Sequence, residues 1–532
     1  MEVTARQLFQ ENRQDEIWDH YCNFLELSTD EAMKIQYRLL EEQLSVLKKS
    51  KLGQELLAGM TSDSIEEFRS KVPFTTYKDY AHYLLEKNED DLPGDAFYWV
   101  HTSGRSGEYR HKWVPYTKRF WERAGRYVIA SLIFGSAGKK GEVVLEPGDT
   151  IFFTLAPRPY MSGALMVDSV LHHFPFKFLP PPEIAEEMDF FDRIEKGLQM
   201  SLTEGIDVFY GIASILLSIG KHFEGGSTDR KKNLGSLLMS PRALARLIKG
   251  MIVSRRKKRG ILPKDIWNPK VLAMGGMDCD IFRDKVIHYW GGNPIEGYAS
   301  TEAGVTAVQT WNRSGNVLIP DQNFLEFIPF AEHLRSKEDP GYIPRTVTMD
   351  QLQENEIYEI VITNFLGGPF VRYRLGDLVK VTAKEDPAIG VCLPHIKFYS
   401  RADDLIDLAG FTRLTELTIW RAIENSGISY NDWVVKKETD QETPVLNIYL
   451  DASGKLSKEE AEEKIHQKLA ELDSDYSDVE KMLNLKPLKV TFLPEGAFQR
   501  YIQKKRAEGV DLARLKPYRM NPSSDTIKTL LE

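Results

Sequence analysis

Short apolar segments that each end in a glycine-rich or polar loop recur from about residue 95 of this 532-residue chain. No other feature of the sequence constrains the fold as strongly. Four of these segments occupy residues 151–157, 206–211, 271–276 and 295–302. Amphipathic stretches, such as residues 121–134 and 185–202, lie between them. Strands that alternate with helices predict a largely parallel, doubly wound α/β sheet. Ligands of such sheets bind beyond the carboxyl ends of the strands, so candidate sites are sought in the loops that follow.

The first seventy residues predict helices. Ser28 and Glu31 have the spacing of a capping box, and apolar residues then recur at steps of four and three over residues 33–47. Two heptads are too short for a coiled coil, so we expect a helix packed on the main core.

The last 130 residues have the composition of a separate unit. Residues 445–451 and 488–494 predict strands, and residues 459–472 predict a charged helix between them. This pattern is typical of a small α+β domain. We therefore predict a large domain over residues 1–402 and a small domain over residues 403–532.

The charge and cysteine content exclude several classes of protein. Lys and Arg number 69 against 78 acidic residues, and a net charge of −9 gives no general reason to bind nucleic acid or an anionic membrane. The three cysteines are too far apart for a disulfide framework. The chain lacks a signal peptide's apolar core and any apolar run of roughly 18 residues, so we expect a cytoplasmic protein without a membrane span.

One basic segment, residues 255–259, departs from the acidic average. A phosphate, nucleic-acid or membrane contact is one interpretation. The interpretation that we favour is a helix end whose cations complement the dipole and face water. Composition says nothing about the oligomeric state.

The richest candidate site is the stretch from His101 to Gly107, with Lys112 nearby. Glycines let backbone N–H groups approach phosphate oxygens, hydroxyls add donors, and cations neutralise charge. The spacing is not that of a Walker loop. Taken alone, the stretch is better explained as a surface turn.

A second candidate, Tyr298 to Glu302, follows directly on an apolar segment. A tyrosine can cover a purine, a threonine can donate to a phosphate, and a glutamate can bind Mg²⁺. The alternative is an ordinary strand-to-helix turn in which Thr301 is the N-cap.

Three further positions complete the set. Asp377 is expected at a strand end, where one carboxylate can accept both ribose hydroxyls, or else in a β-turn. Residues 401–411 lie at the compositional boundary, and Lys516 stands near the C-terminus with nothing local to single it out.

In this order and spacing, the motifs resemble those of the adenylate-forming superfamily. Within it, the chain is most similar to the Gretchen Hagen family of auxin-responsive acyl-acid-amido synthetases and its prokaryotic relatives. The resemblance runs from about residue 65 to the end. It rests on residues 72–84, 103–115, 298–302, 370–377, 401–411 and 514–531. It implies a large adenylate-forming domain with mixed and parallel sheets, and a small mobile α+β domain that turns about a hinge at Asp403.

The resemblance also implies roles for individual residues. The phosphate loop would bind the β- and γ-phosphates of ATP, and the loop residues concerned are Ser103, Gly104, Arg105, Ser106 and Gly107. Gly275, Gly276, Tyr298 and Ser300 would lie around the adenine. Thr301 would contact the α-phosphate, Glu302 would bind Mg²⁺, and Asp377 and Arg401 would hold the ribose. Lys516 would bridge the substrate carboxylate and the α-phosphate. The acyl pocket would involve Tyr160, Tyr210, Ala213, Ser214 and Leu217.

The implied reaction is activation of a carboxylic acid as an acyl-adenylate, followed by transfer to an amino-acid amine. Coenzyme A is the alternative acceptor, for which Lys504, Lys505 and Arg506 are candidate cations. The sequence departs from the family pattern at three positions. Arg105 stands where the family usually has Thr or Ser, and Lys112 comes one residue later than the family's lysine. In the C-terminal motif, Pro517 stands at a different position from the family's proline. A nucleotide-binding regulator without adenylation activity is therefore a further alternative.

Overall fold

The computed structural model forms two compact units, which we describe separately. The first comprises most of residues 1–398, and the second comprises Tyr399–Glu532 together with Gly376–Leu378. The structure describes residues 5–102, 111–155, 157–224, 241–275, 279–339, 341–402, 405–408, 412–440, 443–454, 456–473, 476–477, 487–509 and 515–532.

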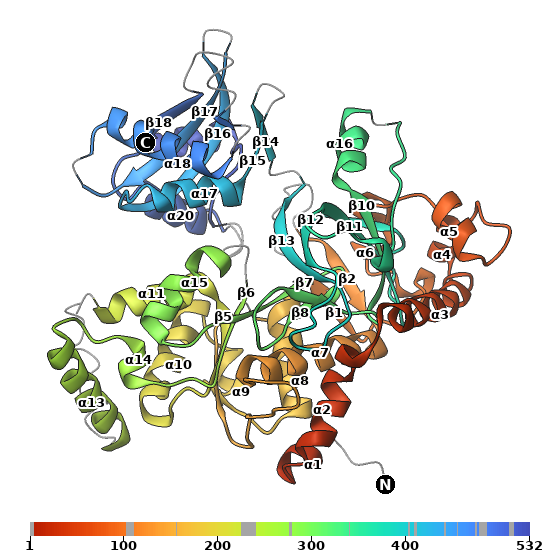
Figure 1. The fold of residues 1–532 in the computed structure, drawn as a ribbon, viewed down its shortest axis with the longest axis horizontal. Coiled ribbons are helices and arrows are strands. Elements are labelled where there is room, and N and C mark those ends of the chain that lie inside the picture. Colours follow the sequence, from red (N-terminus) through yellow and green to blue (C-terminus); the bar gives the residue numbers. More distant parts are fainter. Residues whose placement is uncertain are drawn as a thin grey trace. The chain divides into compact units, whose positions relative to one another are not determined.

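An eleven-stranded sheet is the centre of the first unit (Figure 1). Its strand order is β10-β11-β12-β13-β9-β8-β7-β6-β5-β3-β4. The bounds are β3 (Thr150–Phe153), β4 (Lys177–Leu179), β5 (Val208–Ile212), β6 (Val271–Gly275), β7 (Ile295–Ser300), β8 (Gly304–Gln309), β9 (Asn316–Leu318), β10 (Asn323–Pro329), β11 (Ile357–Asn364), β12 (Tyr373–Ala383) and β13 (His395–Arg401). A separate antiparallel hairpin joins β1 (Tyr98–His101) to β2 (Trp113–Tyr116).

The pairing of neighbouring strands changes from parallel to antiparallel at β7. Strands β4, β3, β5, β6 and β7 are parallel, whereas β7, β8, β9 and β13 pair in antiparallel fashion, as do β10 and β11. The sequence prediction of a largely parallel sheet is therefore correct for one half only. The other half is antiparallel because β7 returns in a tight hairpin instead of crossing over through a helix.

The N-terminal helices are those that the sequence predicts. They are α1 (Ala5–Gln10), α2 (Gln14–Cys22), α3 (Thr29–Leu47), α4 (Lys51–Leu56) and α5 (Ile65–Lys71). Ser28 and Glu31 form the expected capping box at the start of α3. Leu40, Leu44 and Leu47 of α3 are buried against Phe324 of β10, so this helix does pack on the main core.

Ten further helices of the first unit are described. They are α6 (Ala81–Leu84), α7 (Lys118–Ser136), α8 (Met161–His173), α9 (Pro182–Ala185), α10 (Phe190–Glu204), α11 (Ala213–Glu224), α13 (Pro241–Lys257), α14 (Pro263–Ile266), α15 (Cys279–Trp290) and α16 (Phe330–Glu338). Short 3₁₀ turns occur at η1 (Asn23–Glu26), η2 (Tyr77–Asp79), η3 (Glu89–Asp91) and η4 (Met349–Gln351). In the described part of the chain, no helix has the length and apolarity that crossing a membrane requires.

Of the two predicted amphipathic stretches, one lies within a single helix and the other does not. Residues 121–134 lie within α7, whose Gly135 packs closely on the sheet: a Cβ there would stand 2.7 Å from Val271 Cγ1. The stretch 185–202 is instead divided between α9 and α10. The basic segment 255–259 begins in the last turn of α13, as the helix-end interpretation predicts.

The second unit contains a three-stranded sheet of β16 (Tyr430–Asp440), β17 (Thr443–Ala452) and β18 (Leu488–Phe492). A hairpin of β14 (Leu405–Leu408) and β15 (Thr412–Thr415) precedes it, and the helices are α17 (Glu416–Asn425), α18 (Lys458–Leu472), α20 (Ala497–Ala507) and α21 (Ser524–Leu531) (Figure 1). The predicted strand, charged helix and strand are β17, α18 and β18. The edge of β16 that faces away from β17 binds the C-terminal segment. Val435 N donates to Arg519 O (2.7 Å), and Asn521 N donates to Val435 O (2.8 Å).

Candidate active site

The carboxyl ends of β5, β6 and β7 lie side by side because these strands are parallel neighbours. Ile212 pairs with Gly275, and Met274 pairs with Glu296. Of the described part of the chain, a Cβ on Gly275 would meet one atom alone, Gly211 O at 4.0 Å, so these residues leave its backbone face open. The register thus brings Gly275, at the end of β6, close to the motif that ends β7. An open glycine edge is suited to a flat ring.

The motif after β7 forms the turn of a β-hairpin between β7 and β8. Thr301 is therefore not the N-cap of a helix, and the strand-to-helix alternative is wrong. Ser300 Oγ accepts from Ala303 N at 3.0 Å, which closes the turn locally. Tyr298 lies in β7, two residues before Ser300, and is 7% exposed.

Three side chains from other elements hold the backbone of this turn. Tyr116 at the end of β2 donates its hydroxyl to Thr301 O at 2.8 Å. Asn364 at the end of β11 donates to Glu302 O at 3.1 Å, and Asn323 at the start of β10 donates to Ala303 O at 2.7 Å. Every carbonyl of the turn is therefore bound, so the backbone conformation is fixed before any ligand arrives.

The Glu302 carboxylate also has a partner, because Tyr373 donates its hydroxyl to Glu302 Oε1 at 3.3 Å. Burial, and then the charge of Glu302, raise the pKa of Tyr373 well above its ordinary value. Burial and Glu302 likewise raise the pKa of Tyr116. Both tyrosines consequently stay neutral and can donate throughout the physiological pH range.

Glu302 is the one residue that the family resemblance assigns to a metal ion. Among the described residues, no group of three or more His, Cys, Asp or Glu side chains could hold a metal. This donor set fits Mg²⁺, which keeps several waters and takes one or two protein carboxylates plus substrate phosphates. It does not fit a structural zinc site.

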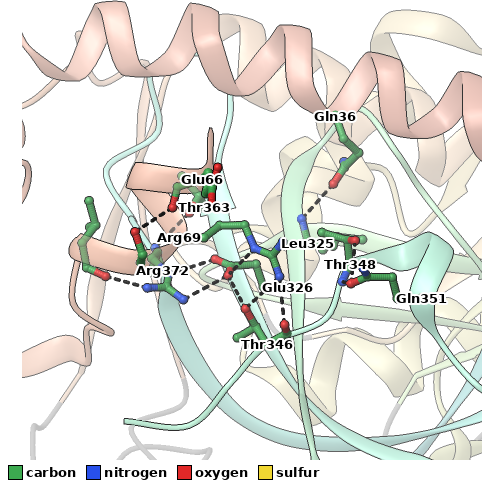
Figure 2. A network of polar contacts seen from close by, with 12 residues as sticks. Gln36, Glu66, Arg69, Leu325, Glu326, Thr346, Thr348, Gln351, Thr363 and Arg372 are labelled. Atoms are coloured by element: carbon green, nitrogen blue, oxygen red, sulfur yellow. Dashed lines mark hydrogen bonds and ion pairs between the residues drawn. The ribbon is translucent and has the colours of Figure 1, made fainter. Parts of the chain in front are cut away.

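Tyr373 is positioned by the buried network in Figure 2. Arg372, directly before it, donates Nε and Nη2 to the two carboxylate oxygens of Glu326 on β10, both at 3.0 Å. Arg69 of α5 and Thr346 reach the same carboxylate, at 3.4 and 2.7 Å (Figure 2). Bidentate arginine–carboxylate pairs fix orientation as well as distance.

Arg374 makes a second pair with Glu359 of β11, at 2.9 Å through Nε and 2.6 Å through Nη2. His333 Nδ1 of α16 lies 2.6 Å from Glu359 Oε2, the same oxygen that accepts from Arg374 Nη2. Despite its burial, Glu359 has a lowered pKa because Arg374 and His333 hydrogen-bond to it. The two arginines of this motif thus anchor the start of β12, while Tyr373 between them reaches Glu302.

Asp377 lies in the early part of β12, next to Gly376 with its φ of +70°, and not in a β-turn. Arg401 Nη1 donates to Asp377 Oδ1 at 2.7 Å. The structure therefore brings together the two side chains that the resemblance assigns to the ribose. The Asp377 side chain is 8% exposed and that of Arg401 is 41% exposed.

Lys516 belongs to the second unit and has a loose environment there. Its side chain is 65% exposed, and Nζ lies 3.8 Å from Asp432 Oδ2. Arg519, three residues later, is firmly held: it pairs with Asp432 at 3.0 Å and lies over the Trp420 ring at 3.6 Å. The tail is anchored by Arg519, whereas Lys516 projects into solvent.

The residues assigned to the acyl pocket come from neighbouring elements. Tyr160 precedes α8 and packs edge-on against His101 at 4.6 Å. Tyr210 lies in β5, where burial raises its pKa to about 12. Ala213 and Leu217, buried on α11, follow directly after β5.

Three domains of one family match this chain. The GH3 family N-terminal domain matches residues 21–176, the central domain residues 316–401 and the C-terminal domain residues 419–525. Together they cover more than half of the chain. The chain belongs to the GH3 family.

Curated GH3 relatives are similar over most of their length. A jasmonoyl–L-amino acid synthetase, JAR4 of Nicotiana attenuata, is 22% identical over 75% of this chain and 74% of its own. The jasmonoyl–L-amino acid synthetase GH3.5 of Oryza sativa subsp. japonica is 20% identical over 96% of both chains.

Solved structures share the fold of this GH3 chain. AtGH3.15 acyl acid amido synthetase in complex with 2,4-DB gives a TM-score of 0.66 at 17% identity, covering 96% of this chain and 94% of that one. A 2-hydroxyisobutyryl-CoA ligase in the postadenylation state gives 0.60 at 15% identity, covering 88% and 87%. The predicted family and fold class are thereby confirmed.

Some of the predicted site residues of this GH3 chain lie outside the described residues. They are Ser103, Gly104, Arg105, Ser106, Gly107, Gly276, Asp403 and the side chain of Ser214. Conversely, sequence reasoning missed Tyr116, Asn323 and Asn364. Asn364 stands directly after an apolar strand, which is the one signal that would have drawn attention to it; Tyr116 and Asn323 carried none.

Proposed function

We propose that this GH3 chain is an ATP-dependent ligase that joins a carboxylic acid to the amine of an amino acid. A carboxylate oxygen would attack the α-phosphorus of ATP, forming the acyl-adenylate as the bond to pyrophosphate breaks. The amine would then attack the activated carbonyl, lose a proton and expel AMP. The relatives named above, which are acyl-acid and jasmonoyl–amino acid synthetases, support the amide product.

The observation that carries this proposal is the fixed turn at Thr301 and Glu302. Its carbonyls are bound by Tyr116, Asn323 and Asn364, so the backbone that carries Thr301 and Glu302 is held in one conformation. Catalysis of phosphoryl-type chemistry depends chiefly on such positioning and on charge neutralisation. Glu302 would hold Mg²⁺, which supplies positive charge to the phosphates.

The other assigned residues complete the proposed site. Gly275 and Tyr298 would flank the adenine, and Ser300, which closes the turn, would support them. Asp377 and Arg401 would hold the ribose. Ser103 to Gly107 would bind the β- and γ-phosphates, and Lys516 would neutralise the charge that accumulates between the carboxylate and the α-phosphate. Domain movement about Asp403 would bring the acceptor to the adenylate.

Coenzyme A as the acceptor is the second candidate, and the fold shared with the 2-hydroxyisobutyryl-CoA ligase supports it. Two of the cations considered for its 3′-phosphate, Lys504 and Lys505, lie on α20. Lys505 pairs with Glu508 at 2.7 Å, and Lys504 Nζ lies 3.9 Å from Glu532. These pairs are typical of a solvated helix face. They give no preference for coenzyme A over an amino acid.

Acid-dependent exchange of pyrophosphate into ATP tests the first step. We expect exchange with a subset of a carboxylic-acid panel, and a loss of about 10²–10³-fold in Lys516→Ala, since removal of one electrostatic group costs that much elsewhere. Lys528→Ala, an exposed lysine of α21, is the matched control and should retain full exchange. Exchange in neither protein, with ATP still bound, would identify a regulator without adenylation activity.

Product analysis tests the acceptor. The acids that support exchange are incubated with ATP and either the twenty amino acids or coenzyme A, and products are identified by mass spectrometry. We expect an amide with one or a few amino acids. A thioester and no amide would contradict the proposal in favour of coenzyme A.

A further inference from the structure

A polar cavity of about 350 Å³ lies in the first unit, lined by residues of η1, α3, α7 and the loop before β10. None of its lining residues belongs to the candidate active site. Its charged lining is unusual because arginines outnumber carboxylates: Arg38, Arg119, Arg123 and Arg126 face Glu42 and Asp321.

Three of these arginines share one face of α7. Arg119, Arg123 and Arg126 are separated by four and three residues, so their side chains emerge on the same side of the helix. Like charges at this spacing repel one another and destabilise the helix unless something compensates them. A negative charge nearby would offset this repulsion.

The two carboxylates compensate only part of this charge. Glu42 pairs with Arg38 at 2.6 Å on α3, and Asp321 pairs with Arg123 while also accepting from the Tyr127 hydroxyl. Each carboxylate is thus used by one arginine. Two positive charges in the cavity remain without a carboxylate.

Arg126 is one of the two. Its Nη2 donates to the neutral Asn23 Oδ1 at 2.7 Å, and its Nε is buried without an acceptor among the described residues. Its positive charge is felt nearby: burial, and then Arg126, lower the pKa of His20. Because Asn23 is neutral, the charge of Arg126 is not paired with either carboxylate that lines the cavity.

Arg119 is the other. It is exposed at the edge of the cavity and makes no hydrogen bond or ion pair with the described part of the chain. Arg119 is exposed and Arg126 is half-buried, and both line this one space. Guanidinium forks match phosphate oxygens in a bidentate manner.

The remaining lining is apolar, with Phe24, Leu39 and Leu366 among its members. A cavity of about 350 Å³ is at the small end of the range for ligand sites, which is roughly 300–1,000 Å³. We propose that this cavity binds a phosphate monoester with a compact apolar body. The two uncompensated charges match a phosphate dianion, and the apolar wall would cover the rest of the ligand.

Titration calorimetry of the full chain with phenyl phosphate tests this site. We expect one equivalent to bind, with an affinity at least tenfold above that of inorganic phosphate, which lacks the apolar body. In Arg119→Gln/Arg126→Gln the affinity should fall by at least tenfold. The control Arg255→Gln/Arg256→Gln removes the same charge from the exposed end of α13 and should bind like the wild type.

The single variant Arg119→Gln keeps the test valid if the double variant does not fold, since this exposed side chain makes no hydrogen bond or ion pair with the residues that the structure describes. It should also weaken phenyl phosphate binding. Equal binding by the wild type and the cavity variants would place the ligand elsewhere and overturn the proposal, as would no binding at all. Equal affinities for phenyl phosphate and inorganic phosphate would refute the role of the apolar wall.

Discussion

Two ion pairs, five residues apart on and before β12, have opposite environments. Arg372 and Glu326 are 4% and 1% exposed and belong to a network with Arg69 and Thr346. Asp377 and Arg401 are 8% and 41% exposed. The first pair is enclosed by protein, so its partners cannot be exchanged. The second has one partner open to solvent, so Arg401 can turn to a ligand at little cost. One sequence motif thus contributes one member to a structural pair and one member to a candidate binding pair.

We expect the largest loss of stability when the buried pair is broken at Arg372. Arg372→Met leaves the Glu326 carboxylate buried without its main cation, and we expect a loss of about 3–5 kcal/mol in the free energy of unfolding. Urea denaturation measures it. Arg401→Met, the same substitution at the exposed pair, should cost only about 0–1 kcal/mol. Equal losses in the two variants would show that the environments do not differ in the way described.

The second effect concerns nucleotide binding. If Arg401 contacts the ribose, Arg401→Met should lower the affinity for ATP by about 10–100-fold, because hydrogen bonds to charged groups contribute roughly 1.5–3 kcal/mol. Calorimetric titration with ATP measures this, and Arg256→Met is the surface control. An unchanged affinity would mean that the pair of Arg401 with Asp377 is structural too.

A smaller effect is expected at Tyr116, whose only described role is to hold the turn. Tyr116→Phe keeps the ring but removes the donor to Thr301 O, a loss of roughly 0.5–1.5 kcal/mol. We expect the rate of pyrophosphate exchange to fall by about 2–10-fold. The affinity for ATP should be unchanged, because Tyr116 would not touch the nucleotide. A fall in affinity without a fall in rate would contradict the positioning role.

The strands that carry the site were predictable from the sequence. The apolar segments at 206–211, 271–276 and 295–302 are β5, β6 and β7, because a buried parallel strand is a short continuous apolar run. The motif after β7 was found for its residue types, but its hairpin conformation was not. Whether a strand is followed by a helix or a hairpin depends on tertiary context, here the pairing of β8 with β9, which the motif itself does not contain.

The supports of the site were the least predictable part. Asn323 and Asn364 are ordinary polar residues in the sequence, and they matter only because β10 and β11 bring them to the turn. Arg372 and Arg374 belong to a motif assigned to nucleotide binding, yet their partners are Glu326 and Glu359. A motif shows which residues occur together. It does not show which of them face the ligand.

The pairing of residues 519–521 with β16 determines where the chain can be shortened. An uncovered edge strand offers unpaired N–H and C=O groups to any other strand, which promotes aggregation. Arg519 and Asn521 occupy that edge at Val435. A truncation before Lys516 would remove the lysine and uncover the edge together. We expect such shortened chains to aggregate because the edge of β16 is uncovered, and to lose activity if Lys516 acts as proposed. One truncation would thus cause both effects.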